Sequence, residues 1–412
     1  MLLKIAWRNI WRSKTRSFVV ILSIAMGVWA LAFILSFSLG MTYSYIENAI
    51  RDQWSHLQVH HPKFSEDKLA KFYIPNAEEV LDSLSGIPEV QAVTPRTIIS
   101  GMVSSSRGAS GVEVVGVDPQ METAVTHLES EIVEGEYFSE KRKSEIILSR
   151  RTAEKLKVGL RNRVVVTFQN LDGTITSVAF RVVGLFSTGN MMFDEGRVFV
   201  KREALQEHLM SIENPAENPA QFIHEIAIFL HSTDELLPVK QRLQKSFQNL
   251  LVQDYRELSP DIELYESQIQ LSNTIMITIF MLALIFGIVN TMLMAVLERY
   301  RELGMLMAIG MNKPRVFSMV VLETLFLGLV AAPLGLGLGW LTVFLLKDGG
   351  IDLSAFAKGM ERFGLDTVVY PLLSPELYVQ IAVAVFVTAL LASLYPALKA
   401  IRLRPVEALQ KV

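Results

Sequence analysis

Four long apolar runs with almost no charge constrain this chain more than any other feature of its sequence. Residues 18–41, 271–297 and 377–398 contain no charged side chain, and residues 316–346 contain one, Glu323. A helix of about 20 apolar residues crosses the hydrocarbon core of a bilayer. Buried helices of soluble proteins rarely reach this length without a polar face. The four runs therefore predict four transmembrane helices over these ranges.

The composition agrees with a membrane protein. Half of the residues are apolar and 20% are charged, below the roughly 25% of ordinary soluble domains. These values argue against a purely soluble chain and against disorder. The net charge of −3 provides no general basic field, so no nucleic acid partner is expected. The chain has no cysteine, which excludes disulfides, thiolate metal sites and cysteine nucleophiles.

Basic residues near the apolar runs predict the orientation. The segment before the first run and the segment 298–315 carry Lys and Arg residues, whereas the loop 347–376 carries more acids than bases. Cytoplasmic flanks of transmembrane helices are enriched in Lys and Arg. We therefore expect a multi-pass protein of the inner (cytoplasmic) membrane with both termini, including the tail 399–412, in the cytoplasm. Residues 42–270 and 347–376 would lie on the periplasmic side.

The first 17 residues have a pattern of their own. Lys4, Arg8, Arg12 and Arg16 recur every four residues, which places them along one stripe of a helix. Trp7 and Leu3 fall on another face. Such a pattern predicts an amphipathic helix at the membrane surface over residues 1–17, in contact with lipids. An ordinary positive flank of the first span is the alternative, and the two readings are compatible.

The long segment 42–270 alternates strand-like and helix-like stretches. Strands are predicted at 56–61, 111–117, 144–148 and 224–230, and a hairpin is predicted around Asp172-Gly173, between 163–168 and 175–185. Asn76 and Ser232 are each followed three residues later by Glu, so both are expected to cap helices, the second over 233–248. These signals predict a mixed α+β domain joined to the spans by helical stalks, 42–52 and 262–270.

Motifs for catalysis or metal binding are absent from the sequence. His56 and His60 have metal-ligand spacing for a helix, but they lie in strand-like sequence, where such positions are about 13 Å apart. The chain contains neither HExxH nor G-x-S-x-G, and it has no Gly-Lys dipeptide and hence no Walker A loop. No catalytic residue, metal or cofactor is therefore assigned to this chain, and any ATP would be bound by another polypeptide.

Small residues recur within the third run. Ala331, Gly335 and Gly339 follow one another at four-residue spacing. This spacing allows two membrane helices to approach closely. It predicts helix packing and not a nucleotide-binding loop.

Three local motifs resemble those of a known transporter family. They are the basic entry Ala6–Ser17, the segment Glu298–Gly310, and Tyr395–Ala400 followed by Arg404–Leu409. Together with the layout of the spans, they are similar to the permeases of the MacB, FtsX and Lol type (type VII ABC transporters). Met307 stands where many relatives carry Arg. Stretches in 57–60, 111–119 and 134–135 look most like the lipoprotein-releasing Lol subunits.

The resemblance implies a non-enzymatic permease subunit with a MacB-like periplasmic core domain. Its partners would be two copies of an ABC ATPase, which would hold ATP and Mg, and a second permease chain, identical or paralogous. Mechanotransmission from the ATPase to the outer domain would drive lipoprotein release, with a lipoprotein substrate and a periplasmic carrier as further partners. Two alternatives remain open: an FtsX-like scaffold that activates an extracytoplasmic hydrolase, and MacB-like export of a peptide or small molecule.

The resemblance also assigns site residues. The segment 298–315 would be the coupling helix, with charges toward solvent and apolar anchors in a groove of the ATPase; its members are Glu298, Arg301, Glu302, Leu303, Gly304, Leu306, Met307 and Gly310. A stripe on the first span would face the acyl chains of the substrate, or else plain lipid or another helix; it comprises Met26, Trp29, Phe33, Phe37 and Met41. Glu323 would make a structural hydrogen bond or take part in coupling.

Overall fold

A computed structural model describes residues 2–139, 142–209, 222–360 and 365–402 of the chain. It divides into two compact units. The helical unit comprises Met1–Thr42, Glu266–Leu353 and Val368–Val412, and the sheet domain comprises Tyr43–Tyr265 and Ser354–Thr367. The end of the predicted tail, residues 403–412, which contain the second half of the third family motif, lies outside the described residues.

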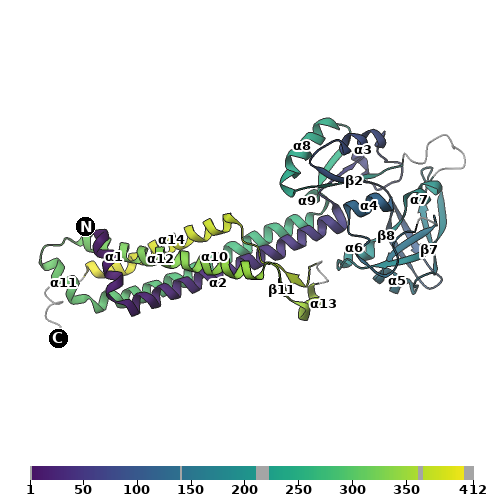
Figure 1. The fold of residues 1–412 in the computed structure, drawn as a ribbon. Coiled ribbons are helices and arrows are strands. Elements are labelled where there is room, and N and C mark those ends of the chain that lie inside the picture. Colours follow the sequence, from purple (N-terminus) through teal and green to yellow (C-terminus); the bar gives the residue numbers. More distant parts are fainter. Residues whose placement is uncertain (1, 140–141, 210–221, 361–364, 403–412) are drawn as a thin grey trace. The chain divides into compact units, whose positions relative to one another are not determined.

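Four of the described helices are long enough to cross a membrane and make up most of the helical unit, and Figure 1 shows them running alongside one another. They are α2 (Lys14–Asn48), α10 (Pro260–Glu298), α12 (Lys313–Leu346) and α14 (Pro375–Ile401). Each is long and apolar enough to cross a membrane, and each contains one of the predicted spans. The helices extend beyond the spans because polar turns continue them. The stalks are helical as expected, although the first ends in a π-helical segment, Ala49–Trp54.

Small residues set the spacing between α12 and α2. A Cβ atom on Gly335 would lie 2.5 Å from the carbonyl oxygen of Ala25, and one on Gly339 would lie 2.9 Å from the Cβ of Ala32. Ala331, one turn earlier, is fully buried. The two backbones therefore approach as closely as glycine allows, which confirms the packing predicted from the four-residue spacing.

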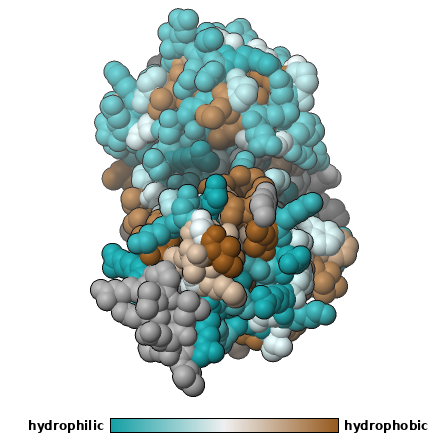
Figure 2. All heavy atoms as spheres, turned by 90° about the vertical axis from the view of Figure 1, so that its left-hand side faces the viewer, coloured by the Kyte–Doolittle hydropathy of each residue, from teal (hydrophilic) through white to brown (hydrophobic). Residues whose placement is uncertain are grey.

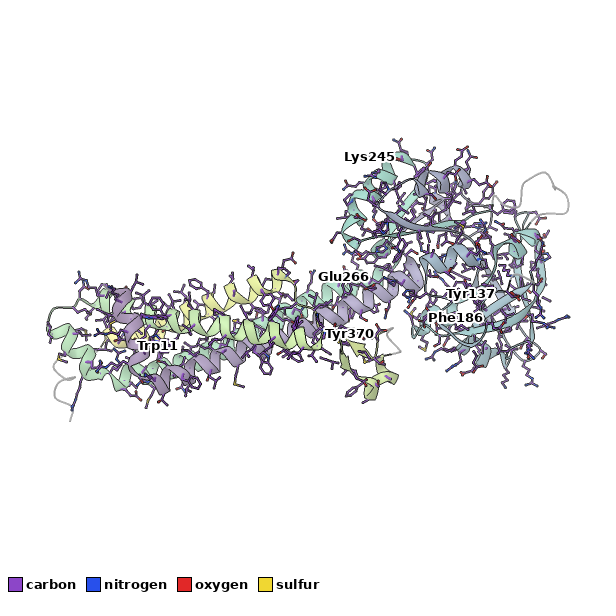
Figure 3. The ribbon with its side chains drawn as sticks, in the orientation of Figure 1. Trp11, Tyr137, Phe186, Lys245, Glu266 and Tyr370 are labelled. Carbon is purple, nitrogen blue, oxygen red and sulfur yellow. The ribbon has the colours of Figure 1, made fainter. Side chains whose placement is uncertain are left out.

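The N-terminal helix is shorter than predicted. Helix α1 (Leu2–Arg12) ends before Ser13, and Arg16 already belongs to α2. The Ser17 hydroxyl donates to the carbonyl of Ile10 at 2.5 Å and holds the two helices at this break. The prediction of one helix over 1–17 was therefore wrong, and the basic stripe is interrupted. On α1, Ile10 is buried, whereas Trp11 remains about half exposed (Figure 3).

Ten strands of the described chain form the sheet of the second unit. Their order is β10-β1-β9-β2-β3-β8-β5-β7-β4, and β6 pairs with β2 and β7. The β3–β8 and β5–β7 pairs are parallel, and the other pairs are antiparallel. The strands are β1 (Leu57–His60), β2 (Val90–Ser104), β3 (Ala109–Val117), β4 (Ile132–Gly135), β5 (Glu145–Ser149), β6 (Arg163–Gln169), β7 (Ile175–Phe186), β8 (Arg197–Lys201), β9 (Glu225–Leu230) and β10 (Leu251–Asp254).

Helices complete this mixed domain and enclose its cores. They are α3 (Ala77–Ser85), α4 (Pro119–Val125), α5 (Arg150–Leu156), α6 (Met191–Gly196), α7 (Arg202–Leu209), α8 (Leu236–Ser246) and α9 (Tyr255–Leu258). The long strand β2 pairs with β9 along its first half and with β3 and β6 along its second. It thereby joins two lobes. One core surrounds Leu57 and Ile228, and another contains Phe186, with Tyr137 packed against it (Figure 3).

The predicted α+β domain is confirmed, and most of its predicted elements are present. The hairpin forms between β6 and β7, with Gly173 at a φ of +86° in the turn. Two helix starts differ from the prediction. Asn76 adopts the left-handed conformation, and its side chain makes no capping hydrogen bond, because a side-chain cap requires an extended backbone. Ser232 caps a 3₁₀ turn, Thr233–Glu235, so α8 begins at Leu236.

The predicted loop 347–376 also contains local structure. Strands β11 (Ile351–Asp352) and β12 (Val368–Val369) pair within the helical unit. The amide of Leu372 donates to the carbonyl of Ser36 on α2 at 3.0 Å. Helix α13 (Ala357–Met360) belongs to the sheet domain.

Candidate docking site at the α11 end of the helical unit

The segment between α10 and α12 folds as a short separate helix, α11 (Tyr300–Ala308). Gly310 ends it with a φ of +108°, a conformation that residues with a Cβ atom rarely adopt. Asn312 then starts α12: its side chain accepts from the amide of Arg315, and Pro314 occupies the first turn. The predicted segment 298–315 therefore contains a nine-residue helix that Gly310 terminates, followed by the capped start of α12.

One face of α11 presents apolar side chains to solvent. Met305 is 51% exposed and Ile309 is 79% exposed, and Ala308 is exposed beside them. Figure 2 shows this end of the helical unit, with apolar atoms surrounded by hydrophilic ones. Apolar groups that are clustered and rimmed by polar residues are typical of an interaction surface. We refer to Met305, Ala308 and Ile309 as the α11 patch.

The opposite face of α11 packs against the chain itself. Leu303 is only 2% exposed and Gly304 is buried, and Leu306 and Met307 pack against the same core. The prediction of Leu303 as an outward anchor was therefore wrong. Residues 301, 305 and 308–309 share one side of a helix of 3.6 residues per turn, and 303 and 306–307 share the other. Met305 and Ile309 were not among the predicted anchors, because apolar residues occur on most sides of this segment.

Charged side chains fix the position of α11 on the bundle. The guanidinium of Arg299 donates from Nη1 to both carboxylate oxygens of Glu323 on α12, at 2.9 and 3.2 Å, and from Nε to Glu302 at 3.2 Å. Arg12 of α1 pairs with Glu302 at 2.8 Å, and Arg16 of α2 pairs with Glu298. We call these six residues the α11 ion network; it links α1, α2, α10, α11 and α12.

The network explains the one charge within the apolar runs. Glu323 lies on α12, and its carboxylate faces Arg299, which lies between α10 and α11. This agrees with the predicted structural role, because a charge within a membrane helix requires such a partner. Arg299 was not predicted as the partner of Glu323, and Arg12 and Arg16 were not predicted as members of the α11 ion network. The sequence signal for these ion pairs was the concentration of Arg residues before the first span and of Arg and Glu residues in 298–302.

A cavity of about 280 Å³ lies among the charges of the α11 ion network. Its lining includes all three arginines and all three glutamates of the network, with Asn9 beside them. Equal numbers of positive and negative groups leave no surplus charge for a bound ion. The arrangement therefore favours a set of ion pairs that holds α11 in place.

The predicted stripe on the first span does not form one exposed face. Met26 is exposed, but Trp29, Phe33, Phe37 and Met41 are half-buried. The indole of Trp29 donates to the hydroxyl of Thr342 on α12 at 3.0 Å. Trp29 therefore makes a contact between helices, which was the alternative reading, and Met26 remains the outward member of the stripe.

The histidines singled out in the sequence are buried in the sheet domain. His56 accepts the amide of Leu230 at Nδ1, and His60 contacts Gln58 at Nε2. Burial lowers the pKa of His56 to about 4 and also lowers the pKa of His60. No group of three or more His, Asp or Glu side chains that could hold a metal ion occurs in the described part of the chain.

Two family models match the chain. Residues 17–246 match the model described as MacB-like periplasmic core domain, and residues 274–405 match the FtsX-like permease C-terminal model. The first match covers more than half of the chain and contains the whole first span and most of the sheet domain. The second contains α11, α12 and α14.

Curated relatives share about a quarter of the sequence. The "Pyoverdine export ATP-binding/permease protein PvdT" of Pseudomonas entomophila (strain L48) is 25% identical, over 99% of this chain and 59% of its own. The "Uncharacterized ABC transporter permease MJ1507" of Methanocaldococcus jannaschii is 23% identical, over 98% of this chain and 96% of its own. The "Macrolide export ATP-binding/permease protein MacB" of Nitrosomonas europaea is 24% identical, over 86% and 54%.

The chain thus spans a little over half the length of these export relatives.

Among solved structures, the extracellular domain of the noncanonic ABC-type transporter YknZ from Gram-positive bacteria is similar, with 17% identity and a TM-score of 0.33, over 48% of this chain and 99% of that one. The periplasmic region of MacB from Actinobacillus actinomycetemcomitans matches with 14% identity and a TM-score of 0.33, over 51% and 93%.

Proposed function

The chain belongs to the family of ABC transporter permeases with a MacB-like periplasmic core domain, and from this premise we propose that α11 docks on a separate ATPase subunit. The α11 patch is the observation that carries the proposal. Ile309 and Met305 are large apolar side chains held in solvent at the C-terminal end of α11. Burying them in a groove of a partner would be favourable at about 25 cal/mol per Å² of apolar area.

The α11 ion network would carry the motion of the ATPase into the bundle. A displacement of α11 acts on α12 through Arg299 and Glu323, and on α1 through Glu302 and Arg12. Charged pairs at hydrogen-bond distance resist separation and can exchange partners within the same cluster. In this proposal α2 and α10, which continue as the stalks, transmit the motion by mechanotransmission, and no substrate needs to cross the bilayer through this chain.

The proposed orientation follows from charge. Lys4, Arg8 and Lys14 are exposed at the α1–α11 end, and cytoplasmic flanks are rich in such residues. We therefore place the α11 patch in the cytoplasm, where an ATPase would have access to nucleotide. The sheet domain would then be periplasmic, and the protein would lie in the inner membrane as a pair with an identical or paralogous permease.

Two cargo classes are consistent with this mechanism. Export of a small molecule is supported by the relatives named for pyoverdine and macrolide export. Lipoprotein release rests on the similarity of stretches in 57–60, 111–119 and 134–135 to the lipoprotein-releasing Lol subunits. Identifying the proteins that co-purify with the tagged chain distinguishes these classes, because lipoprotein release requires a lipoprotein and a soluble carrier and small-molecule export does not.

Ile309→Asp tests the docking proposal directly. Ile175 on the β6–β7 hairpin is a matched control, because it is also isoleucine and is equally exposed, at 78%. We expect Ile309→Asp to abolish co-purification of the ATPase from native membranes, because an unpaired charge buried in an interface costs several kcal/mol. Ile175→Asp should retain the ATPase. Retention by both variants at the same level would exclude the α11 patch as the docking surface.

A further inference from the structure

A second cavity, of about 550 Å³, lies within the sheet domain and takes no part in the proposed docking. Trp54 at the end of the π-helical segment, Phe193 and Met192 of α6, and Arg197 at the start of β8 contribute to its lining. Its size is within the range of small-molecule sites, which combine apolar walls with a few polar groups that converge on the ligand.

Aromatic rings hold Arg197 in one orientation at this cavity. Its guanidinium carbon lies 4.9 Å from the ring centroid of Trp54 and 5.0 Å from that of Phe193. Nε donates to a carboxylate oxygen of Glu113 on β3 at 3.1 Å. Nη1 donates to the carbonyl oxygen of Gln53 at 3.5 Å, and Nη2 donates to no acceptor within the described chain. The guanidinium is therefore held through Nε and Nη1, and its Nη2 group remains available to donate to a carboxylate.

The charges around the cavity are unequal. Lys68 also pairs with Glu113, so two cations share one carboxylate. All three residues line the cavity, which leaves one positive charge without an anion of its own. A ligand with one negative charge would balance the charges of Lys68, Arg197 and Glu113.

The walls of the cavity favour an apolar body on that ligand. Trp54 and Phe193 contribute to its lining, and Met192 is 79% exposed beside them. An unbranched, polarizable methionine adapts to ligands of different shape and makes favourable contacts with aromatic rings. A wholly polar anion would leave these apolar groups in water.

We propose that this cavity binds an amphipathic carboxylate, a compact aromatic or aliphatic body that carries one anionic group. The carboxylate accepts from Nη2 of Arg197 and from Nζ of Lys68, and the apolar body lies against Trp54, Phe193 and Met192. The site is formed by residues of the sheet domain alone. Its occupancy can be measured without the ATPase, so its failure would leave the docking proposal untouched.

A purely structural role for the Arg197–Glu113 pair makes the opposite prediction for one variant. If the pair only held β3 to β8, removing either partner would weaken whatever the cavity binds. In the proposed site, Glu113 competes with the ligand for both cations. Glu113→Gln should therefore tighten binding, whereas Arg197→Gln should weaken it.

The experiment uses the full chain in lipid nanodiscs and the photoreactive probe 4-benzoylbenzoate. Labelled peptides are identified by mass spectrometry, and the half-saturating probe concentration is measured for each variant. We expect labelling near Met192 or Trp54 in the unmodified chain. Arg197→Gln should raise the half-saturating concentration about tenfold, the value of one charge-assisted hydrogen bond. Glu113→Gln should lower it.

Two controls complete the test. Arg163→Gln removes an exposed positive charge from β6, outside the cavity, and should leave the half-saturating concentration unchanged. The neutral 4-benzoylbenzamide should label the same peptides at least tenfold more weakly, because it lacks the anion. Equal labelling by the neutral probe, or a change of the same sign in Arg197→Gln and Glu113→Gln, would overturn the proposal.

Discussion

The two units use the same side chains, arginine and glutamate, in opposite ways. In the sheet domain Arg96 is almost fully buried and donates to Glu122 and Glu225 at 2.6–3.1 Å. In the helical unit Arg12 of the α11 ion network is largely exposed and pairs with Glu302 at 2.8 Å. A buried pair cannot exchange partners without a large loss of free energy, whereas an exposed one can. The first arrangement holds a domain rigid, and the second suits a segment that moves.

Arg96→Met should produce the largest effect. Arg96 lies on β2 where this strand passes from β9 to β3, so its ion pairs join the two lobes. The substitution leaves Glu122 and Glu225 buried without a cation, at a cost of about 3–5 kcal/mol. Hydrogen exchange of the sheet strands, measured as the temperature is raised, should show a clear loss of protection of their backbone amides. Unchanged protection in these strands would show that the buried pairs of Arg96 do not hold the sheet domain rigid, and the contrast with the α11 ion network would fail.

Lowering the pH should have the second-largest effect, because it should destabilise one unit more than the other. All seven histidines of the chain lie in the sheet domain and none lies in the helical unit. Burial lowers the pKa of His224 to about 4, and its Nδ1 accepts the amide of Ile98. Below the ordinary pKa of about 6.5 the unfolded chain binds protons that the folded domain excludes. The stability of the sheet domain should therefore fall between pH 6.5 and 4.

The size of this acid effect is at most about 3 kcal/mol for each buried histidine. Denaturant midpoints of the full chain, recorded by hydrogen exchange at several pH values, would resolve the two units. The sheet domain should lose stability over this range and the helical unit should lose less. A midpoint for the sheet strands that does not change down to pH 4 would show that its histidines already titrate normally.

Gly335→Ala probes the packing of the helical unit. The added methyl group would lie 2.5 Å from the carbonyl oxygen of Ala25 and 2.7 Å from the Cβ of Val28, and neither can move away without separating α12 from α2. Overpacking of this kind costs about 1–3 kcal/mol. Gly337→Ala is the control, since nothing lies within 4 Å of its added atom. Heat inactivation of the detergent-solubilised chain should be faster for Gly335→Ala alone.

Arg12→Gln should have the smallest effect on stability, below about 1 kcal/mol, because the pair with Glu302 is exposed. Its effect on coupling should be larger than its effect on folding. We expect a normal unfolding midpoint together with weaker stimulation of the ATPase. A loss of stability as large as that caused by Arg96→Met would show that the α11 ion network holds the fold together in the same way as the buried ion pairs of Arg96.

The spans and the sheet hairpin were readable from the sequence because both depend on local signals. A long uncharged run or an Asp-Gly turn has the same meaning in many folds. The outward face of α11 was not readable, because Leu303, Met305, Leu306 and Ile309 surround the helix with apolar groups on most sides. Contact with the rest of the bundle decides which of them are buried.

Contacts between distant residues account for the other misses. The bond from Arg299 to Glu323 joins two helices, and no periodicity within either one indicates it. The cavity in the sheet domain collects Trp54, Glu113 and Arg197 from separate parts of the chain through the pairing of β3 with β8. The break after Arg12 depends on the bond between Ser17 and Ile10, which a four-residue charge pattern does not reveal.

Site-specific crosslinking tests the docking of α11 most directly. Photoreactive p-benzoylphenylalanine is placed at Ile309 or, in a second variant, at the equally exposed Ile175, and intact cells of the native host are irradiated. Adducts are then identified by mass spectrometry. We expect the residue at position 309 to capture a nucleotide-binding ATPase, and the residue at position 175 not to capture it. Capture of the ATPase at position 175 and not at position 309 would contradict docking through α11.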